Sequence, residues 1–221
     1  MGGRAEKLSG LCVSEMSEGE IALLRSEIAS SPAVGRIGEI GTAAGGTLVR
    51  LIKGFTPEEL ARVLVVEPFT YFENQLGVFR NNLMHHGIDP ERLDVRVGRS
   101  LDAFRKAREK GERFSFIIID ASHKLKYVMQ DLQWLCLLET GGKAAIHDYH
   151  ENTPGVMLAV DIFLRRNPNY RRKELKDKLL LLEKTSESTR CEVSNLNLLF
   201  ASLYSNILHN KQSLKKKWGK K

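Results

Sequence analysis

The chain has 221 residues, of which 42% are hydrophobic and 28% are charged, and this composition is ordinary for one globular domain with a single sizeable core. It contains no apolar run of about 18 residues, which excludes a transmembrane helix, and residues 1–14 lack the apolar centre of a signal peptide. The cysteines Cys12, Cys136 and Cys191 are scattered and lack zinc-ligand spacing, so we expect a reducing, cytoplasmic location and no membrane association.

The formal net charge of +7 is concentrated at the end of the chain. Residues 211–221 hold six lysines and no acidic residue, so the remainder is nearly neutral. The simplest interpretation of this basic tail is a solvated terminus, and a weak nonspecific contact with phosphates is the alternative. Because the body of the chain carries little net charge, nucleic acid is not the partner that the composition favours.

The first predicted element is a helix that begins near Ser17. Ser17 and Glu20 have the spacing of a capping box, and apolar residues follow at helical intervals until Pro32. We expect residues 1–34 to form an N-terminal helical segment. This helix would either pack against the edge of the domain or cover a ligand site.

A strand, a glycine-rich turn and a helix follow in immediate succession. The stretch 36–47 reads as a buried strand that ends in a glycine-rich turn, and the helix is predicted over Thr47–Lys53. Between them, Gly41 and Gly45 allow close approach of the backbone, because no Cβ intervenes. Such a unit places backbone N–H groups of a helix N-terminus around a ligand, although an ordinary tight turn between strand and helix has the same local pattern.

The spacing of the glycines excludes a dinucleotide fingerprint. That motif requires G-x-G-x-x-G, whereas Gly38, Gly41 and Gly45 are separated by two and then three residues. In addition, the acidic residue Glu39 lies inside the end of the strand, where a carboxylate would repel a pyrophosphate. The turn therefore suits a cationic or amino-bearing ligand.

The rest of the chain alternates between strands and helices. Strands are predicted at 63–66, 93–97, 114–119 and 143–146, and helices at 69–85, 101–109, 125–138 and 155–166. Nearly continuous apolar runs are typical of parallel strands buried on both faces. This order predicts an α/β fold with a doubly wound, Rossmann-like sheet and right-handed crossovers over residues 35–185.

The end of the chain departs from this alternation. Residues 171–175 and 178–182 read as a hairpin that closes one edge of the mostly parallel sheet. A C-terminal helix is expected within 186–210, before the tail. Its apolar stripe comprises Leu196, Leu199, Phe200, Leu203 and Ile207. The stripe either docks on its own domain or forms the contact of a homodimer.

In a doubly wound sheet, ligands bind beyond the carboxyl ends of the strands, so the residues just after each strand are candidates for a site. Glu67 follows the second strand, roughly twenty residues beyond the glycine turn, where a carboxylate can accept both hydroxyls of a ribose. Ser100 follows the third strand, where it would cap the next helix and border an adenine ring. Asp120–His123 and His147–Tyr149 follow the fourth and fifth strands.

Taken together, these motifs resemble one family. Residues 39–47, Glu67, 98–100 and 116–149 are similar to the class I S-adenosylmethionine-dependent methyltransferases, notably the catechol and macrolide-sugar O-methyltransferase types. The resemblance covers about residues 34–184. It implies the doubly wound methyltransferase sheet, S-adenosyl-L-methionine as the cofactor, and O-methylation of a small hydroxylated acceptor, either a sugar or a phenol.

Two other functions stay open beside this one. A nucleic-acid methyltransferase would carry an Asn/Asp-Pro-Pro-Tyr tetrapeptide after the fourth strand to stack a flipped base, and Asp120–His123 does not match it. A cofactor-binding protein without catalysis, which regulates a partner, is the other alternative. Turnover on a panel of hydroxylated acceptors distinguishes it from an enzyme.

The resemblance implies a role for each matching position. The residues expected to bind the cofactor are Glu39, Gly41, Thr42, Gly45, Thr47, Glu67, Ser100 and Asp120. Glu67 would hold the ribose and Ser100 would contact the adenine. His123 matches the position of a general base beside Asp120, and a histidine titrates in the range that this role needs. His123 could instead be a helix-start residue that is satisfied by backbone carbonyls.

The resemblance also implies a divalent cation, Mg²⁺ or another, which would orient the acceptor hydroxyl and lower its pKa. Asp120 and Asp148 match the two carboxylates that hold it. The catechol-type pattern has an amide directly after the second carboxylate, whereas this chain has Tyr149, so the cation site lacks one side chain. His147, His150 and Glu151 lie nearby in the sequence, but none matches the pattern. A requirement for the metal therefore stays open.

Overall fold

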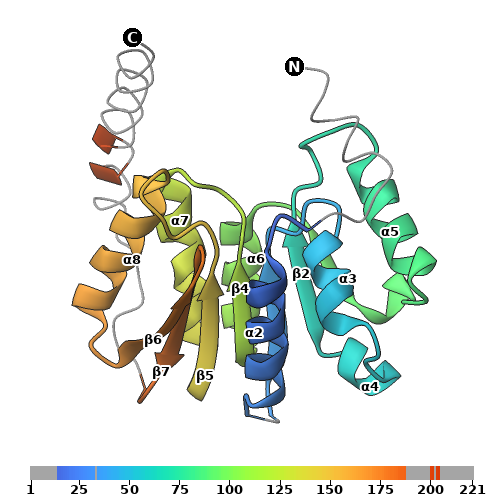
Figure 1. The fold of residues 1–221 in the computed structure, drawn as a ribbon, viewed down its shortest axis with the longest axis horizontal. Helices are drawn as coiled ribbons and strands as arrows, with labels where there is room; N and C mark the ends of the chain where they lie inside the picture. The colour runs from blue at the N-terminus through green and yellow to red at the C-terminus, as the bar shows by residue number, and fades with distance from the viewer. Residues whose placement is uncertain (1–13, 33, 188–199, 202, 205–221) are drawn as a thin grey trace.

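The computed structural model describes residues 14–32, 34–187, 200–201 and 203–204. Their strands are β1 Arg36–Ile40, β2 Val63–Glu67, β3 Asp94–Val97, β4 Phe114–Ile119, β5 Leu138–Ile146, β6 Tyr170–Lys176 and β7 Leu179–Lys184. They form one seven-stranded sheet in the order β3-β2-β1-β4-β5-β7-β6 (Figure 1). The first five strands pair in parallel, and β7 is antiparallel to both β5 and β6. The predicted doubly wound sheet and its closing hairpin are confirmed.

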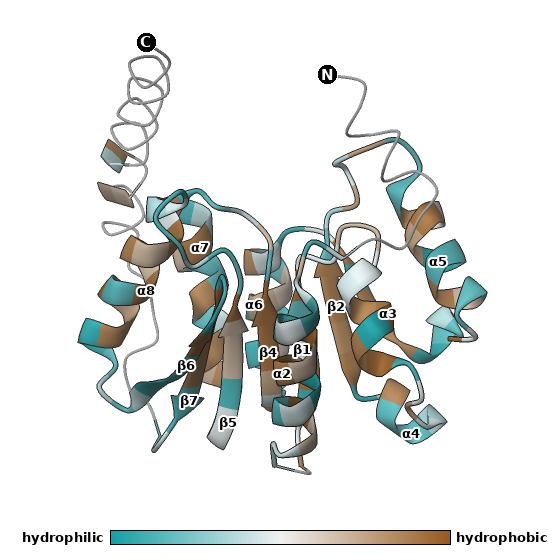
Figure 2. Ribbon diagram, viewed as in Figure 1, coloured by the Kyte–Doolittle hydropathy of each residue, from teal (hydrophilic) through white to brown (hydrophobic). Residues whose placement is uncertain are grey.

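Helices cover both faces of this sheet (Figure 1). They are α2 Glu18–Ala29, α3 Gly46–Ile52, α4 Pro57–Leu60, α5 Gln75–His85, α6 Ser100–Glu109, α7 Leu125–Asp131 and α8 Pro154–Arg166, with 3₁₀ turns η1 Pro90–Arg92 and η2 Leu132–Leu137. One buried apolar cluster joins the sheet to α2, α3 and α5, and a second joins its opposite face to α6, α7 and α8. The strands β2 and β4 are accordingly apolar along most of their length (Figure 2).

Two predicted helices are shorter in the structure. The helix expected from residue 69 begins at Gln75, because Phe69 and Asn74 have φ values of 55° and 52°, which no α-helix accommodates. The helix expected over 125–138 ends at Asp131 and continues as η2. The tighter 3₁₀ winding buries Trp134 and Leu135 together, and the chain then enters β5 at Leu138, earlier than predicted.

The N-terminal helix α2 is capped as predicted. Ser17 accepts a hydrogen bond from the backbone N–H of Glu20, and the Glu20 carboxylate accepts one from the backbone N–H of Ser17. At the other end of α2, a buried ion pair joins Glu27 to Lys143 of β5, with Oε2 and Nζ 2.7 Å apart. The helix is thus held on the face of the sheet beside α3 rather than at its edge (Figure 1).

Much of the C-terminal region lies outside the described residues, including Leu196, Leu199, Ile207 and the lysine tail. Four residues of the predicted helix are described and helical. Ala201 is buried in the same apolar cluster as α7 and α8, whereas Phe200 and Leu203 are 62% and 58% exposed. Among these four residues, Ala201 therefore packs on the domain, whereas Phe200 and Leu203 are largely exposed.

Candidate active site

The carboxyl ends of β1, β2, β4 and β5 meet at one edge of the sheet, because these strands are parallel. Backbone hydrogen bonds continue the ladder one residue past the strands: Gly41 N–H donates to Val66 O at 2.9 Å, and Asp120 N–H donates to Ile40 O at 2.9 Å. Similarly, His147 N–H donates to Ile119 O at 3.0 Å. The glycine turn and the residues after β4 and β5 are consequently neighbours in space.

The glycines of the turn are required by close contacts. Gly41 has a φ of 86°, and a Cβ at this position would lie 2.5 Å from the backbone of Asp120 and Ala121. Gly45 has a φ of 83°, and its Cβ would lie 2.9 Å from the ring of Phe79. The turn therefore packs directly against the residues that follow β4, and α3 begins immediately behind it.

Glu39 is the buried acid of this turn. Burial, together with the nearby charges of Asp120 and Glu67, raises its pKa to about 8. Among the described residues, no hydrogen-bond partner reaches Glu39 Oε2 or Thr42 Oγ1, although both atoms are buried. Buried polar atoms are normally paired, so this pair of oxygens fits a ligand that brings donors or a positive charge. This agrees with the ligand class predicted from the turn.

Glu67 holds the turn from the neighbouring strand. Its Oε2 accepts hydrogen bonds from the backbone N–H groups of Thr42 at 3.1 Å and Ala43 at 3.4 Å, and its Oε1 accepts one from Phe69 N–H at 3.2 Å. A carboxylate has about four acceptor positions, so these contacts leave capacity for a hydroxyl. The N-terminal segment also touches the turn, since the hydroxyls of Ser14 and Thr47 are 2.8 Å apart.

Ser100 does not cap its helix as expected, because Arg99 is the N-cap and Ser100 is the first helical residue. The Ser100 hydroxyl instead accepts a hydrogen bond from Trp134 Nε1 at 2.9 Å. It also bonds the side chain of Asp131, whose pKa burial raises to about 7. The serine side chain is therefore engaged with α7 and η2, which the sequence pattern did not indicate.

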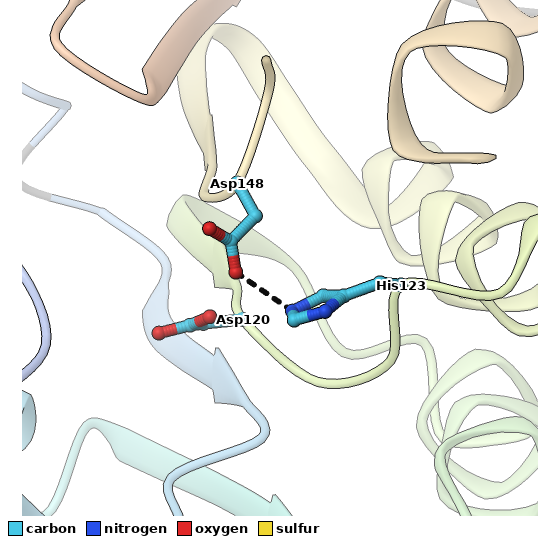
Figure 3. A group of neighbouring side chains, drawn as sticks. All are labelled: Asp120, His123 and Asp148. Carbon is cyan, nitrogen blue, oxygen red and sulfur yellow. Dashed lines mark ion pairs between the residues drawn. The ribbon is translucent and has the colours of Figure 1, made fainter. Parts of the chain in front are cut away.

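Asp120, His123 and Asp148 converge beyond the ends of β4 and β5 (Figure 3). Each offers one atom within 4.8 Å of the other two, and His123 Nε2 lies 2.7 Å from Asp148 Oδ2. The hydrogen bond with Asp148 raises the pKa of His123, and the same bond lowers the pKa of Asp148 to about 2. The side chain of His123 is 53% exposed, so the ring is accessible to a substrate.

His147 is a member of this site that the motif comparison did not match. Its side chain is only 3% exposed, with Nδ1 3.1 Å from Asp120 Oδ1 and 3.7 Å from Asp148 Oδ2. On the other side of the ring, Nε2 lies 3.8 Å from Glu20 Oε1. Burial lowers the pKa of His147, but the bond to Asp120 and the charges of Asp148 and Glu20 outweigh it, so the pKa is raised.

Tyr149, the residue after Asp148, packs into an apolar cluster. Tyr149 is buried in the cluster beneath α7 and α8, and the guanidinium of Arg172 lies 5.5 Å from its ring centroid. Its backbone N–H donates to Lys178 O at 2.8 Å, so it anchors the loop to the hairpin. Of the other side chains near the expected cation site, His150 also approaches Asp148, with Nε2 3.4 Å from Asp148 Oδ1. Tyr149 therefore contributes packing to the loop rather than an oxygen to a cation.

Comparison with known proteins identifies the family. The family described as "Methyltransferase domain" matches residues 39–149, from the buried acid of the glycine turn to the residue after Asp148. The match spans half of the chain, and the protein belongs to this methyltransferase family. No curated protein sequence matches it significantly. Among the described helices, none is long and apolar enough to cross a membrane.

Several solved structures share the fold. An O-methyltransferase from Bacillus cereus in complex with SAH has 20% sequence identity and a TM-score of 0.64, covering 83% of this chain and 86% of that one. The O-methyltransferase TomG from Streptomyces achromogenes, in complex with SAM, has 18% identity and a TM-score of 0.61, covering 84% and 91%. The TDP-rhamnose 3′-O-methyltransferase CalS11 has 17% identity and a TM-score of 0.58, covering 74% and 76%.

Proposed function

We propose that this methyltransferase transfers a methyl group from S-adenosylmethionine to a hydroxyl group of a small molecule, a sugar or a phenol. The observation that carries the proposal is the convergence of Asp120, His123 and Asp148 beside a glycine turn that contains a buried acid. The structures that share this fold include O-methyltransferases in complex with SAH and with SAM, and one that is named as a TDP-rhamnose 3′-O-methyltransferase. These likenesses support both the cofactor and the class of acceptor.

The turn offers what the cofactor requires. S-adenosylmethionine carries an α-amino group and a sulfonium, and the unpaired oxygens of Glu39 and Thr42 suit such a partner. In the proposed arrangement, Gly41, Gly45 and Thr47 shape the turn around the methionine end. Glu67 holds the ribose while it retains the backbone N–H groups of the turn. The segment at Ser100 borders the adenine, and the hydroxyl of Ser100 fixes this segment to η2.

When bound, S-adenosylmethionine supplies an electrophilic methyl group that forms a bond to the acceptor oxygen and leaves S-adenosylhomocysteine. The work of the protein is to align the hydroxyl and to accept its proton. His123 accepts that proton at a ring nitrogen, and Asp148, 2.7 Å from Nε2, stabilises the resulting imidazolium. Asp120 lies beside the reacting groups, on the side of the site that faces Gly41.

Asp120 and Asp148 would also hold a divalent cation. Their oxygens lie within 4.8 Å of each other, which suits two ligands of one ion, and two carboxylates that face each other repel unless a positive charge lies nearby. The chemistry that such an ion supplies is a lowered pKa of the acceptor hydroxyl. His123 remains the group that accepts the proton.

We also propose domain boundaries and a cellular location for the protein. Residues 35–185 form the methyltransferase domain, preceded by the N-terminal helical segment 1–34 and followed by a C-terminal helix within 186–210 and the basic tail 211–221. The uncovered side chains of Phe200 and Leu203 support a homodimer contact. The protein acts in the cytoplasm, where Cys136, a free thiol in the structure, would stay reduced.

The proposal is tested in two steps. Calorimetric titration with S-adenosylhomocysteine should show micromolar or tighter binding, and its absence would overturn the assignment of the cofactor. A panel of catechols, simple phenols and sugar nucleotides is then incubated with the enzyme and methyl-labelled S-adenosylmethionine. Incorporation of label into a hydroxylated compound supports an enzyme. Tight cofactor binding with no incorporation across the panel would favour the non-catalytic, regulatory alternative.

A further inference from the structure

We propose that His147 is the third protein ligand of a divalent cation held by Asp120 and Asp148, that Glu20 orients its ring, and that the site prefers a first-row transition metal ion to Mg²⁺. This inference rests on the proposed function, because it deepens the assignment of the same site. His147 would supply the ligand that the catechol-type pattern takes from an amide, whose position Tyr149 occupies in this chain.

The imidazole nitrogen Nδ1 of His147 lies beside both carboxylates. His147 Nδ1 lies 3.1 Å from Asp120 Oδ1 and 3.7 Å from Asp148 Oδ2. Adjacent ligands of a six-coordinate ion with bonds of about 2.1 Å are separated by about 3 Å, so these spacings need little adjustment to enclose one ion. All three residues follow directly after parallel strands, which provide a rigid base for the site.

A carboxylate lies behind the ring of His147, on the side opposite Asp120. His147 Nε2 is buried, finds no hydrogen-bond partner among the described residues, and lies 3.8 Å from Glu20 Oε1. Glu20 is itself held, since its oxygens accept backbone N–H groups of Ser17 at 2.7 Å and Lys178 at 2.9 Å. A histidine that binds a metal usually directs its other ring nitrogen at a carboxylate, which selects the tautomer and orients the ring.

The surroundings of His147 differ from those of His123. His123 has a half-exposed side chain on the loop after β4, and its Nε2 already bonds Asp148 at 2.7 Å. His147, by contrast, has a ring that packing and two carboxylates hold in one place. His123 is therefore free to accept a proton, whereas His147 has the structural features of a metal ligand.

The donor set decides the metal. Mg²⁺ prefers oxygen ligands and bound waters. Imidazole nitrogen instead favours first-row transition metal ions such as Mn²⁺, Fe²⁺, Co²⁺ and Zn²⁺, and the affinity of a given site generally rises from Mn²⁺ to Co²⁺. A site with one imidazole and two carboxylates should therefore bind Co²⁺ or Mn²⁺ more tightly than Mg²⁺. The selectivity is a property of the apo protein and needs neither cofactor nor acceptor.

The experiment uses the untagged full chain, treated with a chelator, and the metals alone as probes. Calorimetric titration with Co²⁺, Mn²⁺ and Mg²⁺ gives the affinities, and the visible absorption of bound Co²⁺ reports nitrogen ligation. We expect Co²⁺ to bind at least tenfold more tightly than Mg²⁺. His147→Ala should remove this preference, and Glu20→Gln should weaken Co²⁺ binding roughly 10–100-fold, the usual effect of removing the carboxylate behind a metal-bound histidine.

Two controls keep the result specific. Glu59 is the glutamate of a second capping box, with Thr56 on α4, so Glu59→Gln makes the same chemical change at a helix terminus away from the site. His85→Ala removes an exposed histidine from the end of α5. Both should leave Co²⁺ binding unchanged. Glu20→Gln retains a side-chain oxygen, which keeps the test available if His147→Ala does not fold.

Equal affinity for Co²⁺ and Mg²⁺ would overturn the inference. So would a loss of Co²⁺ binding in His123→Ala together with full binding in His147→Ala, because His123 would then be the third ligand. Titration with S-adenosylhomocysteine is measured on the same samples. Its failure would count against the proposed function, whereas normal cofactor binding without metal selectivity would count against this inference alone.

Discussion

His123 Nε2 lies 2.7 Å from Asp148 Oδ2, across the loops that leave β4 and β5. The two residues are 25 positions apart, and only the parallel pairing of the two strands brings them together. This pair couples the group that would accept a proton to the group that would hold a cation.

Replacement of His123 should remove the proton acceptor. We expect His123→Ala to lower turnover by roughly 10²-fold or more, the size of a general-base contribution, while affinity for S-adenosylhomocysteine is largely retained. Steady-state kinetics on an acceptor identified from the panel, together with calorimetry, measure both quantities. His85→Ala is the matched control at an exposed histidine. Unchanged turnover in His123→Ala would remove this residue from the mechanism.

The pH dependence of turnover should reflect the contact between His123 and Asp148. The hydrogen bond that His123 donates to Asp148 raises the pKa of His123 above its ordinary value of 6.5, so the neutral ring becomes abundant only above that pH. Turnover should accordingly rise with pH through a pKa above 6.5. In Asp148→Asn, the ring loses its anionic partner, and the rising limb should move to lower pH while maximal turnover falls. If the rising limb of turnover against pH lies at the same pH in Asp148→Asn as in the wild type, a group other than His123 titrates.

Glu67 should contribute to cofactor binding through the ribose. Glu67→Ala should weaken the binding of S-adenosylhomocysteine by about 1–3 kcal/mol, the usual cost of lost hydrogen bonds to a charged group. Because Glu67 also holds the N–H groups of Thr42 and Ala43, the variant could lose affinity by loosening the turn. An analogue that lacks the ribose 2′-hydroxyl separates the two effects. It should bind the wild type more weakly than the parent compound does, and Glu67→Ala should no longer distinguish them.

Glu39 should make the stability of the apo protein depend on pH. Its folded pKa is raised from 4.5 to about 8, so its contribution to the free energy of unfolding is fully present below about pH 4.5 and is lost as the pH rises toward 8. Glu39→Gln removes this dependence. At pH 8 the variant should be more stable than the wild type, by an amount on the order of a few kcal/mol, since each pKa unit corresponds to about 1.4 kcal/mol.

Urea unfolding at pH 5 and pH 8, without cofactor, measures that difference. The variant should at the same time bind S-adenosylmethionine more weakly, because the amide carries no charge for the amino group of the cofactor. Identical pH dependence in the two proteins would mean that Glu39 is ionised in the folded state. A stabilised variant with full cofactor affinity would instead leave the methionine end without its assigned partner.

Gly41 should not tolerate a side chain. A Cβ at this position would lie 2.5 Å from the backbone of Asp120 and Ala121, and the φ of 86° is strained for any other residue. Gly41→Ala is therefore expected to lower the melting temperature and to abolish tight binding of S-adenosylhomocysteine. Gly54→Ala is the control, since Gly54 has a φ of 95° but open space around it. A similar loss of cofactor binding in both variants would point to backbone strain rather than to the contact with Asp120.

The sequence by itself indicated a doubly wound sheet with a closing hairpin and the edge of that sheet that carries the candidate site. Continuous apolar runs such as Phe114–Ile119 are buried wherever the strand lies, and glycines mark the turn after β1, so both follow from local chemistry. Residues directly after parallel strands must then share an edge. This is why Glu67, Asp120 and Asp148 were expected at one edge without coordinates, whereas their roles in a site rest on the family resemblance.

Tertiary structure alone decided the contacts that depend on packing between distant segments. Glu20 and His147 are 127 positions apart and meet because α2 docks on the sheet through Ile21 and Leu24. In the same way, Trp134 turns the Ser100 hydroxyl into the core. Local pattern specifies that a residue caps a helix or follows a strand, but the direction of its side chain is set by the neighbours that pack against it, and those are chosen by the whole fold.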